Sequence, residues 1–215
     1  ILANSEHFKI NNKTSYKSEN LIKGENNKIK KATKIIKNSQ KAVIIAGGGI
    51  KYTSKYKEVI KLAEFLNIPI VTAAGHGDAI PFNHKLNAGQ MGPRGNPVAS
   101  RLVKEADVII ALGTRLGFNS TFYSYDNINK KAKIIQVELE KKMLGRYFPI
   151  SVGICADSAI ATSQIYNELK KQKTILDVKN WTNLYIKERI NFLKNRDKIN
   201  LKKIFLFSLL GYLKN

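Results

Sequence analysis

Cysteine is almost absent from this 215-residue sequence, and tryptophan, methionine and arginine are scarce. The single thiol, Cys155, excludes a disulfide framework and is typical of a protein from a reducing compartment such as the cytoplasm. Within the run VGICAD we expect Cys155 to be buried packing rather than a nucleophile. The chain must therefore be stabilised by a hydrophobic core, which its 43% of hydrophobic residues can supply.

Hydrophobic runs long enough to cross a membrane are also missing. The apolar run IFLFSLLGYL, at 204–213, is about half as long as the ~20 residues that a transmembrane helix requires. No signal peptide is visible, and the chain begins at Ile1 rather than at Met, which suggests a piece of a longer protein. We expect a cytoplasmic location and no membrane partner.

Negative charge is scarce, with 16 acidic against 37 basic residues and a formal net charge of +21. A basic surface can bind nucleic acid because it releases counterions from the phosphates. Here the positive charge is mostly lysine, scattered as in NNKIKKATKIIKNSQK, without interleaved aromatic residues or a groove-reading motif. We expect no nucleic-acid partner.

Motifs of a complete catalytic apparatus are missing as well. The sequence has no G-x-S-x-G motif, and nothing in it resembles a Ser-His-Asp or Cys-His arrangement. His76, Asp78 and His84 lack the spacing and the fourth ligand of a metal site. We therefore predict no catalytic residue and no metal ligand in this chain.

Short apolar, β-branched runs alternate with amphipathic segments as far as about residue 170. This alternation predicts an α/β fold, a Rossmann-like open parallel sheet of about five to six strands with flanking helices. The runs lack polar alternation, as expected for strands buried on both faces. The predicted strands span residues 42–47, 68–73, 107–113, 133–139 and 150–154.

Helices are predicted near 27–37, between the first two strands, at 96–106 and after Asp157. Asn96 and Asp157 are the expected N-caps, and Pro97 suits a first helical position. Most of these helices begin beyond the carboxyl end of a strand or a glycine-rich loop. Ligands of open parallel sheets bind at that edge.

The loops at this edge contain three candidate features. The turn Gly47, Gly48, Gly49 is not a G-x-G-x-x-G fingerprint, so it either cradles a phosphate or turns the chain for steric reasons alone. Arg115, two residues after Gly113, either grips a phosphate or forms a salt bridge to a neighbouring loop. Glu138 either accepts hydrogen bonds from a ribose or is a solvated loop carboxylate.

Six segments, taken in order over residues 30–170, resemble the central domain of thiamine-diphosphate enzymes of the acetolactate synthase family. They are AVIIAGGGI, IPIVTAAGHGDAIPFNH, NAGQMGPRGNP, ADVIIALGTRLGFNST, KIIQVELEKKMLG and ISVGICADS. The runs HGDAIPFNH and KKMLGRYFPISVGICADSA are most similar to the sulfoacetaldehyde acetyltransferase branch of that family.

The resemblance implies one domain of a larger enzyme that transfers a two-carbon unit. Residues 1–25 would be the linker leaving a missing N-terminal pyrimidine-binding domain, and 26–171 the central domain. Residues 172–215 would be a helical, Lys-rich connector toward a missing C-terminal diphosphate-binding domain. Thiamine diphosphate, magnesium and the small-molecule substrate would bind in the missing domains of a homodimer or homotetramer, so this chain alone would be inactive.

The resemblance also implies an accessory adenine nucleotide, since some relatives hold FAD and others ADP in the central domain. The matching positions are Gly47, Gly48, Gly49, Gly113, Arg115, Glu138 and Asp157. Three departures from the family pattern disfavour FAD: Glu138 replaces an aspartate, Ala156 replaces a glycine, and the RLGFNST loop is shorter. FAD, ADP or a vestigial site remain open, as do a stand-alone nucleotide-binding module and a purely structural or dimerisation module.

Overall fold

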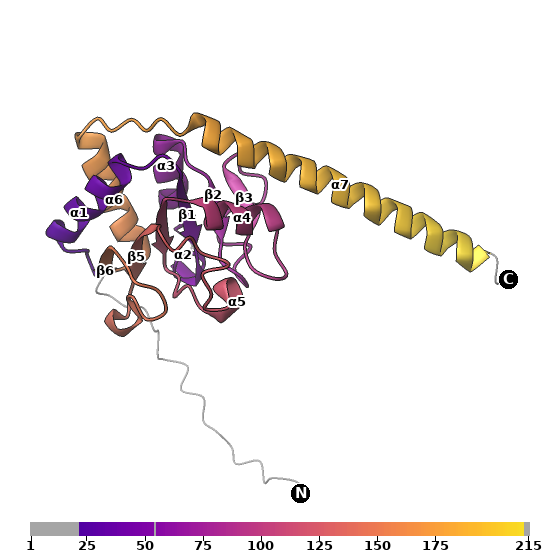
Figure 1. Ribbon diagram of the computed structural model, residues 1–215, viewed down its shortest axis with the longest axis horizontal. Coiled ribbons are helices and arrows are strands. Elements are labelled where there is room, and N and C mark those ends of the chain that lie inside the picture. The colour runs from indigo at the N-terminus through magenta and orange to yellow at the C-terminus, as the bar shows by residue number, and fades with distance from the viewer. Residues whose placement is uncertain (1–21, 54, 213–215) are drawn as a thin grey trace, which may run out of the picture.

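Six parallel strands form one open sheet in the computed structural model, which describes residues 22–53 and 55–212, with side chains as far as 198 except that of Thr53. The strand order is β3-β2-β1-β4-β5-β6 (Figure 1). Their bounds are β1 Ala42–Ala46, β2 Ile70–Thr72, β3 Asn87–Gln90, β4 Val108–Leu112, β5 Lys133–Glu138 and β6 Val152–Cys155. The predicted Rossmann-like α/β fold is confirmed.

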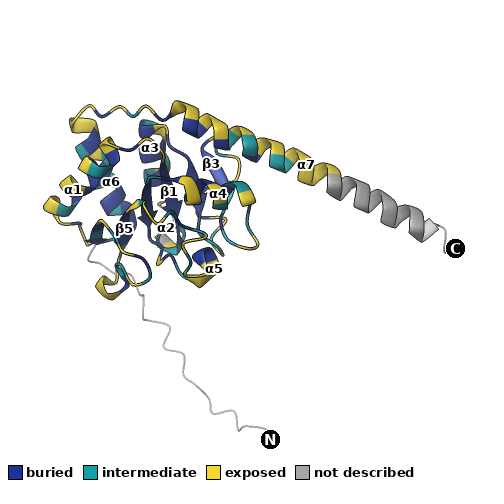
Figure 2. Cartoon of the chain, viewed as in Figure 1, coloured by how far each residue is buried: buried dark blue, intermediate teal, exposed yellow. Residues whose placement is uncertain are grey.

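The two central strands, β1 and β4, consist entirely of buried residues, with Ala42 opposite Val108 and Ala46 opposite Leu112. Helices cover both faces of the sheet, so no side chain of these strands reaches water. Figure 2 shows this buried centre beneath helices whose outer surfaces are exposed. The continuous apolar runs in the sequence are therefore a direct consequence of the layered architecture.

The longer helices form two groups. Helices α1 (Asn26–Lys37), α3 (Tyr56–Leu66) and α6 (Ser158–Lys171) pack together, because α6 contacts both of the others. Helices α4 (Pro97–Glu105) and α7 (Lys179–Tyr212) contact each other and β3. The short elements α2 (Gly48–Thr53), α5 (Phe118–Thr121) and η1 (Lys141–Met143) lie in loops that follow β1, β4 and β5.

The structure differs from the sequence-based expectation at one strand and at one helix. β3 is absent from the predicted strands, and Asn87–Gln90 contains no β-branched or aromatic residue that would indicate it. The Asn87 side chain holds this strand in place: its Nδ2 donates to Pro81 O at 3.0 Å, and its Oδ1 accepts from Gly89 N at 2.8 Å. The single helix expected between the first two strands is divided into α2 and α3.

Both predicted N-caps are confirmed. The Asn96 side chain accepts a hydrogen bond from Val98 N at 2.8 Å, directly before Pro97 begins α4. The Asp157 carboxylate accepts from Ala159 N and Ile160 N, each at 3.0 Å. These contacts satisfy backbone groups that the helices cannot pair internally.

Helix α7 docks on the sheet through one face of its first turns. Trp181, Tyr185 and Arg189, four residues apart, are all buried. Trp181 Nε1 donates to Ala42 O at 3.0 Å, and Thr182 Oγ1 donates to Asn67 O at 2.7 Å. The rest of α7 extends past the sheet (Figure 1). The helical character predicted for the C-terminal region is thus present over Lys179–Tyr212.

Two sequence-based predictions fall partly or wholly outside the described residues. Most of the predicted 1–25 linker lies there, as do the side chains of the 204–213 apolar run. Among the helices of the described residues, none has the length and apolar character needed to cross a membrane.

The docking of α7 should depend on pH through Tyr185. Burial raises the pKa of Tyr185 to about 12 from the 10.0 of an ordinary tyrosine. The unfolded chain therefore loses this proton first, and stability that is present below pH 10 declines as the pH rises toward 12. We expect the free energy of unfolding in urea to fall less steeply over this range for Tyr185→Phe than for the wild type. Equal slopes for the two proteins would contradict the assignment.

Candidate functional site

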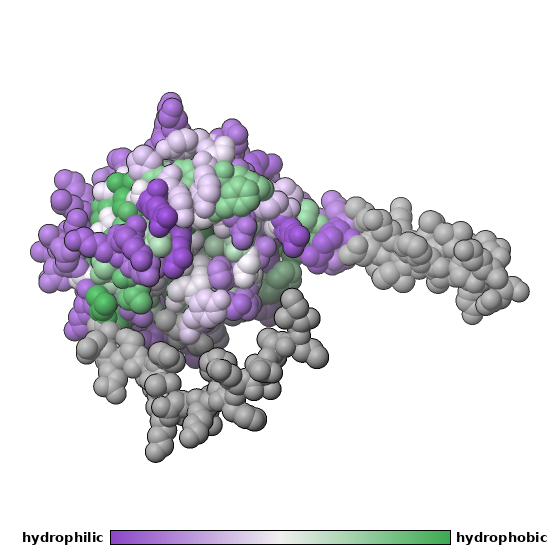
Figure 3. Space-filling model, turned by 90° about the horizontal axis from the view of Figure 1, so that it is seen from below, coloured by the Kyte–Doolittle hydropathy of each residue, from purple (hydrophilic) through white to green (hydrophobic). Residues whose placement is uncertain are grey.

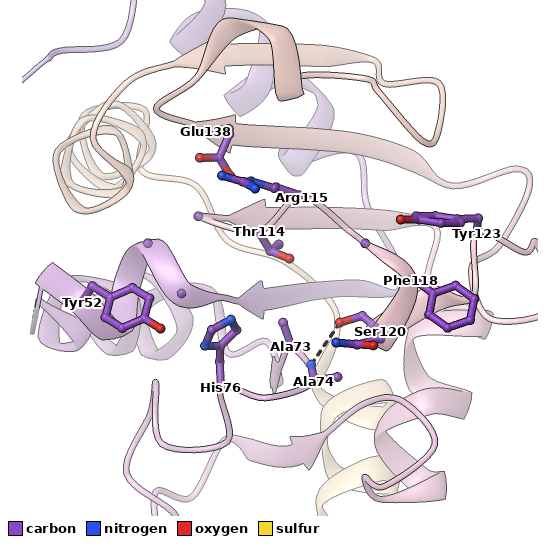
Figure 4. A pocket seen from close by; sticks show the side chains of 15 residues that line it. Tyr52, Ala73, Ala74, His76, Thr114, Arg115, Phe118, Ser120, Tyr123 and Glu138 are labelled. Carbon is purple, nitrogen blue, oxygen red and sulfur yellow. Dashed lines mark hydrogen bonds between the residues drawn. The ribbon is translucent and has the colours of Figure 1, made fainter. Parts of the chain in front are cut away.

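A cavity of about 600 Å³ lies at the carboxyl edge of the sheet, where the chain leaves β1, β2, β4 and β5. β1 and β4 are neighbours there, but the chain continues from them toward opposite sides of the sheet, toward β2 and toward β5. Such a switch point is where open parallel sheets bind ligands. The volume falls within the ~300–1,000 Å³ range of small-molecule sites. Figure 4 shows the lining side chains converging on this space.

Three glycines bring the loops after β1 and β4 into backbone contact. A Cβ on Gly47 would lie 2.4 Å from Gly113 O, and one on Gly49 would lie 2.7 Å from Gly113 Cα. Gly113 itself has φ +59°, a conformation that favours glycine. Gly47 N and Gly49 N donate to Leu112 O and Gly113 O, both at 3.0 Å. A steric requirement is therefore sufficient to explain Gly47, Gly49 and Gly113.

Gly48 faces the cavity instead. A Cβ at this position would lie 3.0 Å from His76 Cε1 and 3.2 Å from a ring carbon of Tyr52. His76 and Tyr52 also line the cavity and meet edge to face, with ring centroids 6.0 Å apart. The absent side chain of Gly48 leaves room between these rings and the sheet edge.

Arg115 lines the cavity directly after β4. Its side chain is 56% exposed, and its Nη2 lies 4.0 Å from Glu140, whose carboxylate also lies 3.9 Å from Lys142. The salt bridge considered from the sequence therefore exists, but such a long and exposed pair contributes little stability. Arg115 can still turn toward an anionic ligand.

Glu138 lines the same cavity at the end of β5. Its Oε1 accepts a hydrogen bond from Leu139 N at 3.0 Å, which orients the carboxylate. A carboxylate can accept further hydrogen bonds on both oxygens. Ala156, which replaces a glycine of the family pattern, does not narrow this space. It is buried outside the cavity lining, and its N–H donates to Glu138 O at 3.1 Å.

The structure brings five of the seven predicted site residues together around one cavity and leaves two outside its lining. The five are Gly48, Gly49, Gly113, Arg115 and Glu138. Gly47 packs against the backbone of the β4 loop, and the Asp157 carboxylate caps α6.

Sequence reasoning missed several lining residues, among them Tyr52, Phe118 and Tyr123, and it considered His76 only as a metal ligand. Ser120 Oγ accepts from Ala74 N at 3.0 Å and so joins the loops after β2 and β4 (Figure 4). His76 Nδ1 is buried and has no partner within the described part of the chain. The density of aromatic residues in GFNSTFYSY was the available signal, but it carried no motif.

Two exposed side chains of the loops have shifted pKa values. A hydrogen bond from Lys51, at 3.0 Å, lowers the pKa of Asp78, so this carboxylate stays ionised at neutral pH. A hydrogen bond with Tyr147 raises the pKa of Tyr123, whose ring stacks on Tyr147 at 4.4 Å. Tyr123 therefore stays neutral well above pH 7.

Exposed aromatic residues, among them Tyr52, Phe118 and Tyr123, line the cavity, and Phe122 contacts Phe118 beside it. Phe118, Phe122 and Tyr123 come from α5 and the residues after it, and Tyr52 comes from α2. Figure 3, a view of the molecule from below, shows separate hydrophobic patches within a largely hydrophilic surface.

The residues considered as metal ligands are used elsewhere. His84 Nε2 lies 3.5 Å from Glu64, and Asp78 pairs with Lys51. Within residues 22–53 and 55–212, no group of three His, Cys, Asp or Glu side chains could hold a metal ion. Cys155, expected to be buried, is only half-buried at the end of β6, where its Sγ donates to Leu139 O at 3.3 Å.

Comparison with known proteins shows the family to which the chain belongs. Residues 29–165 match the family described as thiamine pyrophosphate enzyme, central domain. The chain belongs to this family. The resemblance derived from the sequence is confirmed.

Curated relatives of this thiamine pyrophosphate enzyme central domain include sulfoacetaldehyde acetyltransferases and acetolactate synthase large subunits. A sulfoacetaldehyde acetyltransferase of Castellaniella defragrans is 36% identical over 148 residues, or 68% of this chain and 25% of the relative. A probable acetolactate synthase large subunit of Methanococcus aeolicus is 31% identical over 146 residues, covering 68% and 24%. The acetolactate synthase large subunit of Buchnera aphidicola subsp. Schlechtendalia chinensis is 30% identical over 197 residues, covering 86% and 33%. The matched region thus spans about a quarter to a third of these relatives.

Because of the backbone contact below the cavity, substitution of Gly113 by alanine should destabilise the protein far more than the same substitution of a nearby glycine. Gly113→Ala places a Cβ 2.6 Å from Gly49 Cα at a positive φ, whereas a Cβ on Gly117 meets nothing within 4 Å. We expect Gly113→Ala to lower the free energy of unfolding by roughly 2–4 kcal/mol. Gly117→Ala, the matched control, should change it by less than about 0.5 kcal/mol in the same urea titration. Similar losses for both variants would contradict the packing argument.

Asp157 should act as a helix cap. Asp157→Ala removes two hydrogen bonds at the start of α6 and should cost about 1 kcal/mol of unfolding free energy. Asp157→Asn keeps an acceptor oxygen and should recover most of that loss in thermal denaturation. If Asp157→Asn were as unstable as Asp157→Ala, charge rather than capping would be responsible.

Proposed function

We propose that this central domain holds an adenine nucleotide within a thiamine-diphosphate-dependent two-carbon transferase, of the sulfoacetaldehyde acetyltransferase or acetolactate synthase type. The observation that carries the proposal is the cavity at the sheet switch point, which combines glycine backbone, Arg115 and Glu138. The names of the relatives support the class of enzyme. In this view the nucleotide is an accessory group rather than the reacting one.

The thiamine chemistry itself is assigned to parts of a larger protein. The described residues contain no group of metal-ligating side chains that could hold magnesium beside a diphosphate. We infer that thiamine diphosphate, magnesium and the small-molecule substrate bind outside this chain, which alone is inactive. The same proposal includes the domain limits predicted from the sequence. It also includes a cytoplasmic homodimer or homotetramer that has no nucleic-acid or membrane partner.

The chemistry of the cavity suits the parts of a nucleotide. Arg115, held by a weak salt bridge, is suited to a diphosphate because a guanidinium donates paired hydrogen bonds to phosphate oxygens. Glu138 can accept hydrogen bonds from ribose hydroxyls. Tyr52 and Phe118 offer exposed ring faces for a base.

ADP fits the principal cavity more simply than FAD. A second cavity of about 480 Å³ shares Ala74, Phe118 and Asn119 with the first and continues to Pro93 and Arg94. ADP would use the first cavity alone, whereas the larger FAD would extend into the second. We therefore favour ADP.

Titration calorimetry of the 215-residue chain with ADP and with FAD tests this proposal. Arg115→Gln should weaken ADP binding by about 10–100-fold, the value of a charge-assisted hydrogen bond. Lys142→Gln is the matched control, because Lys142 neighbours the same Glu140 but lies outside the lining, and it should bind within about twofold of the wild type.

Absence of binding by either nucleotide, or equal weakening by the two variants, would overturn the nucleotide role. Exposed Phe118, Phe122 and Tyr123 at the cavity mouth would then favour the second candidate, a structural domain whose aromatic edge packs against another domain or subunit.

A further inference from the structure

A separate cavity of about 440 Å³ lies between the ends of β2 and β3 and the helix α7. None of its lining residues lines the first cavity. Three of them are arginines, Arg94, Arg189 and Arg196, and none is acidic. The charged side chains that line this cavity are therefore all positive, and the cavity shares no lining residue with the first cavity.

Arg189 is the most unusual of these residues because it is only 7% exposed. Its Nη2 donates to Phe82 O at 2.7 Å, and its guanidinium lies 4.9 Å from the centre of the Phe82 ring. Within the described chain Arg189 has no salt-bridge partner, and burial lowers its pKa. A buried cation without an anionic partner is costly to keep.

Thr72, which lines the same cavity, adds a second, independent observation. This last residue of β2 is 1% exposed and lines the cavity. Its Oγ1 is buried and finds no hydrogen-bond partner in the part of the chain that the structure describes. Buried hydroxyls are normally hydrogen-bonded, so an acceptor or donor supplied by a ligand would satisfy it.

The remaining lining combines apolar side chains with two further arginines. Phe82, Phe192 and Leu193 contribute hydrophobic surface. Arg94 is exposed in the loop after β3, and Arg196 pairs with Asp197 at 3.1 Å near the cavity rim. The cavity thus combines a buried guanidinium and a buried hydroxyl with an apolar surface.

We propose that this cavity binds a small organic phosphate, whose oxyanion contacts Arg189 and Thr72 and whose apolar body packs against Phe82, Phe192 and Leu193. The volume falls within the range of small-molecule sites. Arginine is suited to the phosphate because its planar fork donates two parallel hydrogen bonds. The ligand supplies the negative charge that the protein does not place beside Arg189.

Phenyl phosphate is the probe, and its binding is measured by titration calorimetry. The parent protein is the full 215-residue chain with Arg115→Gln, a substitution that weakens anion binding in the first cavity. We expect one binding event per chain, with inorganic phosphate weaker and the neutral benzyl alcohol inactive. Arg189→Met should weaken phenyl phosphate at least about tenfold, and Thr72→Val about threefold or more. Lys194→Gln, which removes an exposed charge from the same helix outside the lining, should bind within about twofold of its parent.

Thermal denaturation separates binding from a merely structural role of Arg189. Without ligand, Arg189→Met should melt at or above the temperature of its parent, because it removes an unpaired buried charge. Phenyl phosphate should then raise the melting temperature of the parent but not of Arg189→Met. A marked fall in the ligand-free melting temperature of Arg189→Met would assign Arg189 to its contact with Phe82 O.

Two other outcomes would overturn the proposal. One is the absence of phenyl phosphate binding by the parent chain. The other is a Thr72→Val variant that folds normally and binds as well as the parent, since the buried hydroxyl would then have no ligand to contact. Binding of inorganic phosphate and phenyl phosphate with equal affinity would contradict the apolar part of the assignment.

Discussion

The adjacency of β1 and β4 is the constraint on which the rest of the molecule depends. These strands pair along their whole length, yet the chain leaves them toward opposite edges of the sheet. Their following loops must therefore pass at backbone distance, and Gly47, Gly49 and Gly113 make that passage possible. The hydrogen bonds from Gly47 N and Gly49 N to the β4 side hold the two loops together. The cavity exists because the chain diverges directly above this contact.

The parts of the fold that could be read from the sequence are those governed by local chemistry. Continuous apolar runs predicted β1 and β4 because both faces of each strand are buried. Asn96 and Asp157 were recognisable as N-caps because capping needs a particular side chain at one position. β3 was not recognisable. Its four residues pair with β2, and the Asn87 side chain ties the strand to the loop before it, and neither interaction is described by a propensity.

The candidate site shows the same division. Gly48, Gly49, Gly113, Arg115 and Glu138 follow strands, so the topology of a parallel sheet was enough to bring them together. His76 belongs to the loop after β2, whose path is set by tertiary hydrogen bonds such as Ala74 N to Ser120 Oγ. The role of Arg189 was equally hidden, because nothing in a lysine-rich helix distinguishes a buried guanidinium from an exposed one.

Helix α7 has a mechanical consequence. At ~1.5 Å per residue, its 34 residues span about 50 Å, and among its side chains described as far as residue 198 the buried ones lie in the turns near Trp181, Tyr185 and Arg189. A continuous helix transmits both direction and rotation, so inserting one residue beyond the anchor would turn everything after it by about 100° and advance it by ~1.5 Å. The anchored turns therefore set the rotational orientation of the whole helix. A movement of these turns at the sheet edge would rotate the distant end of α7.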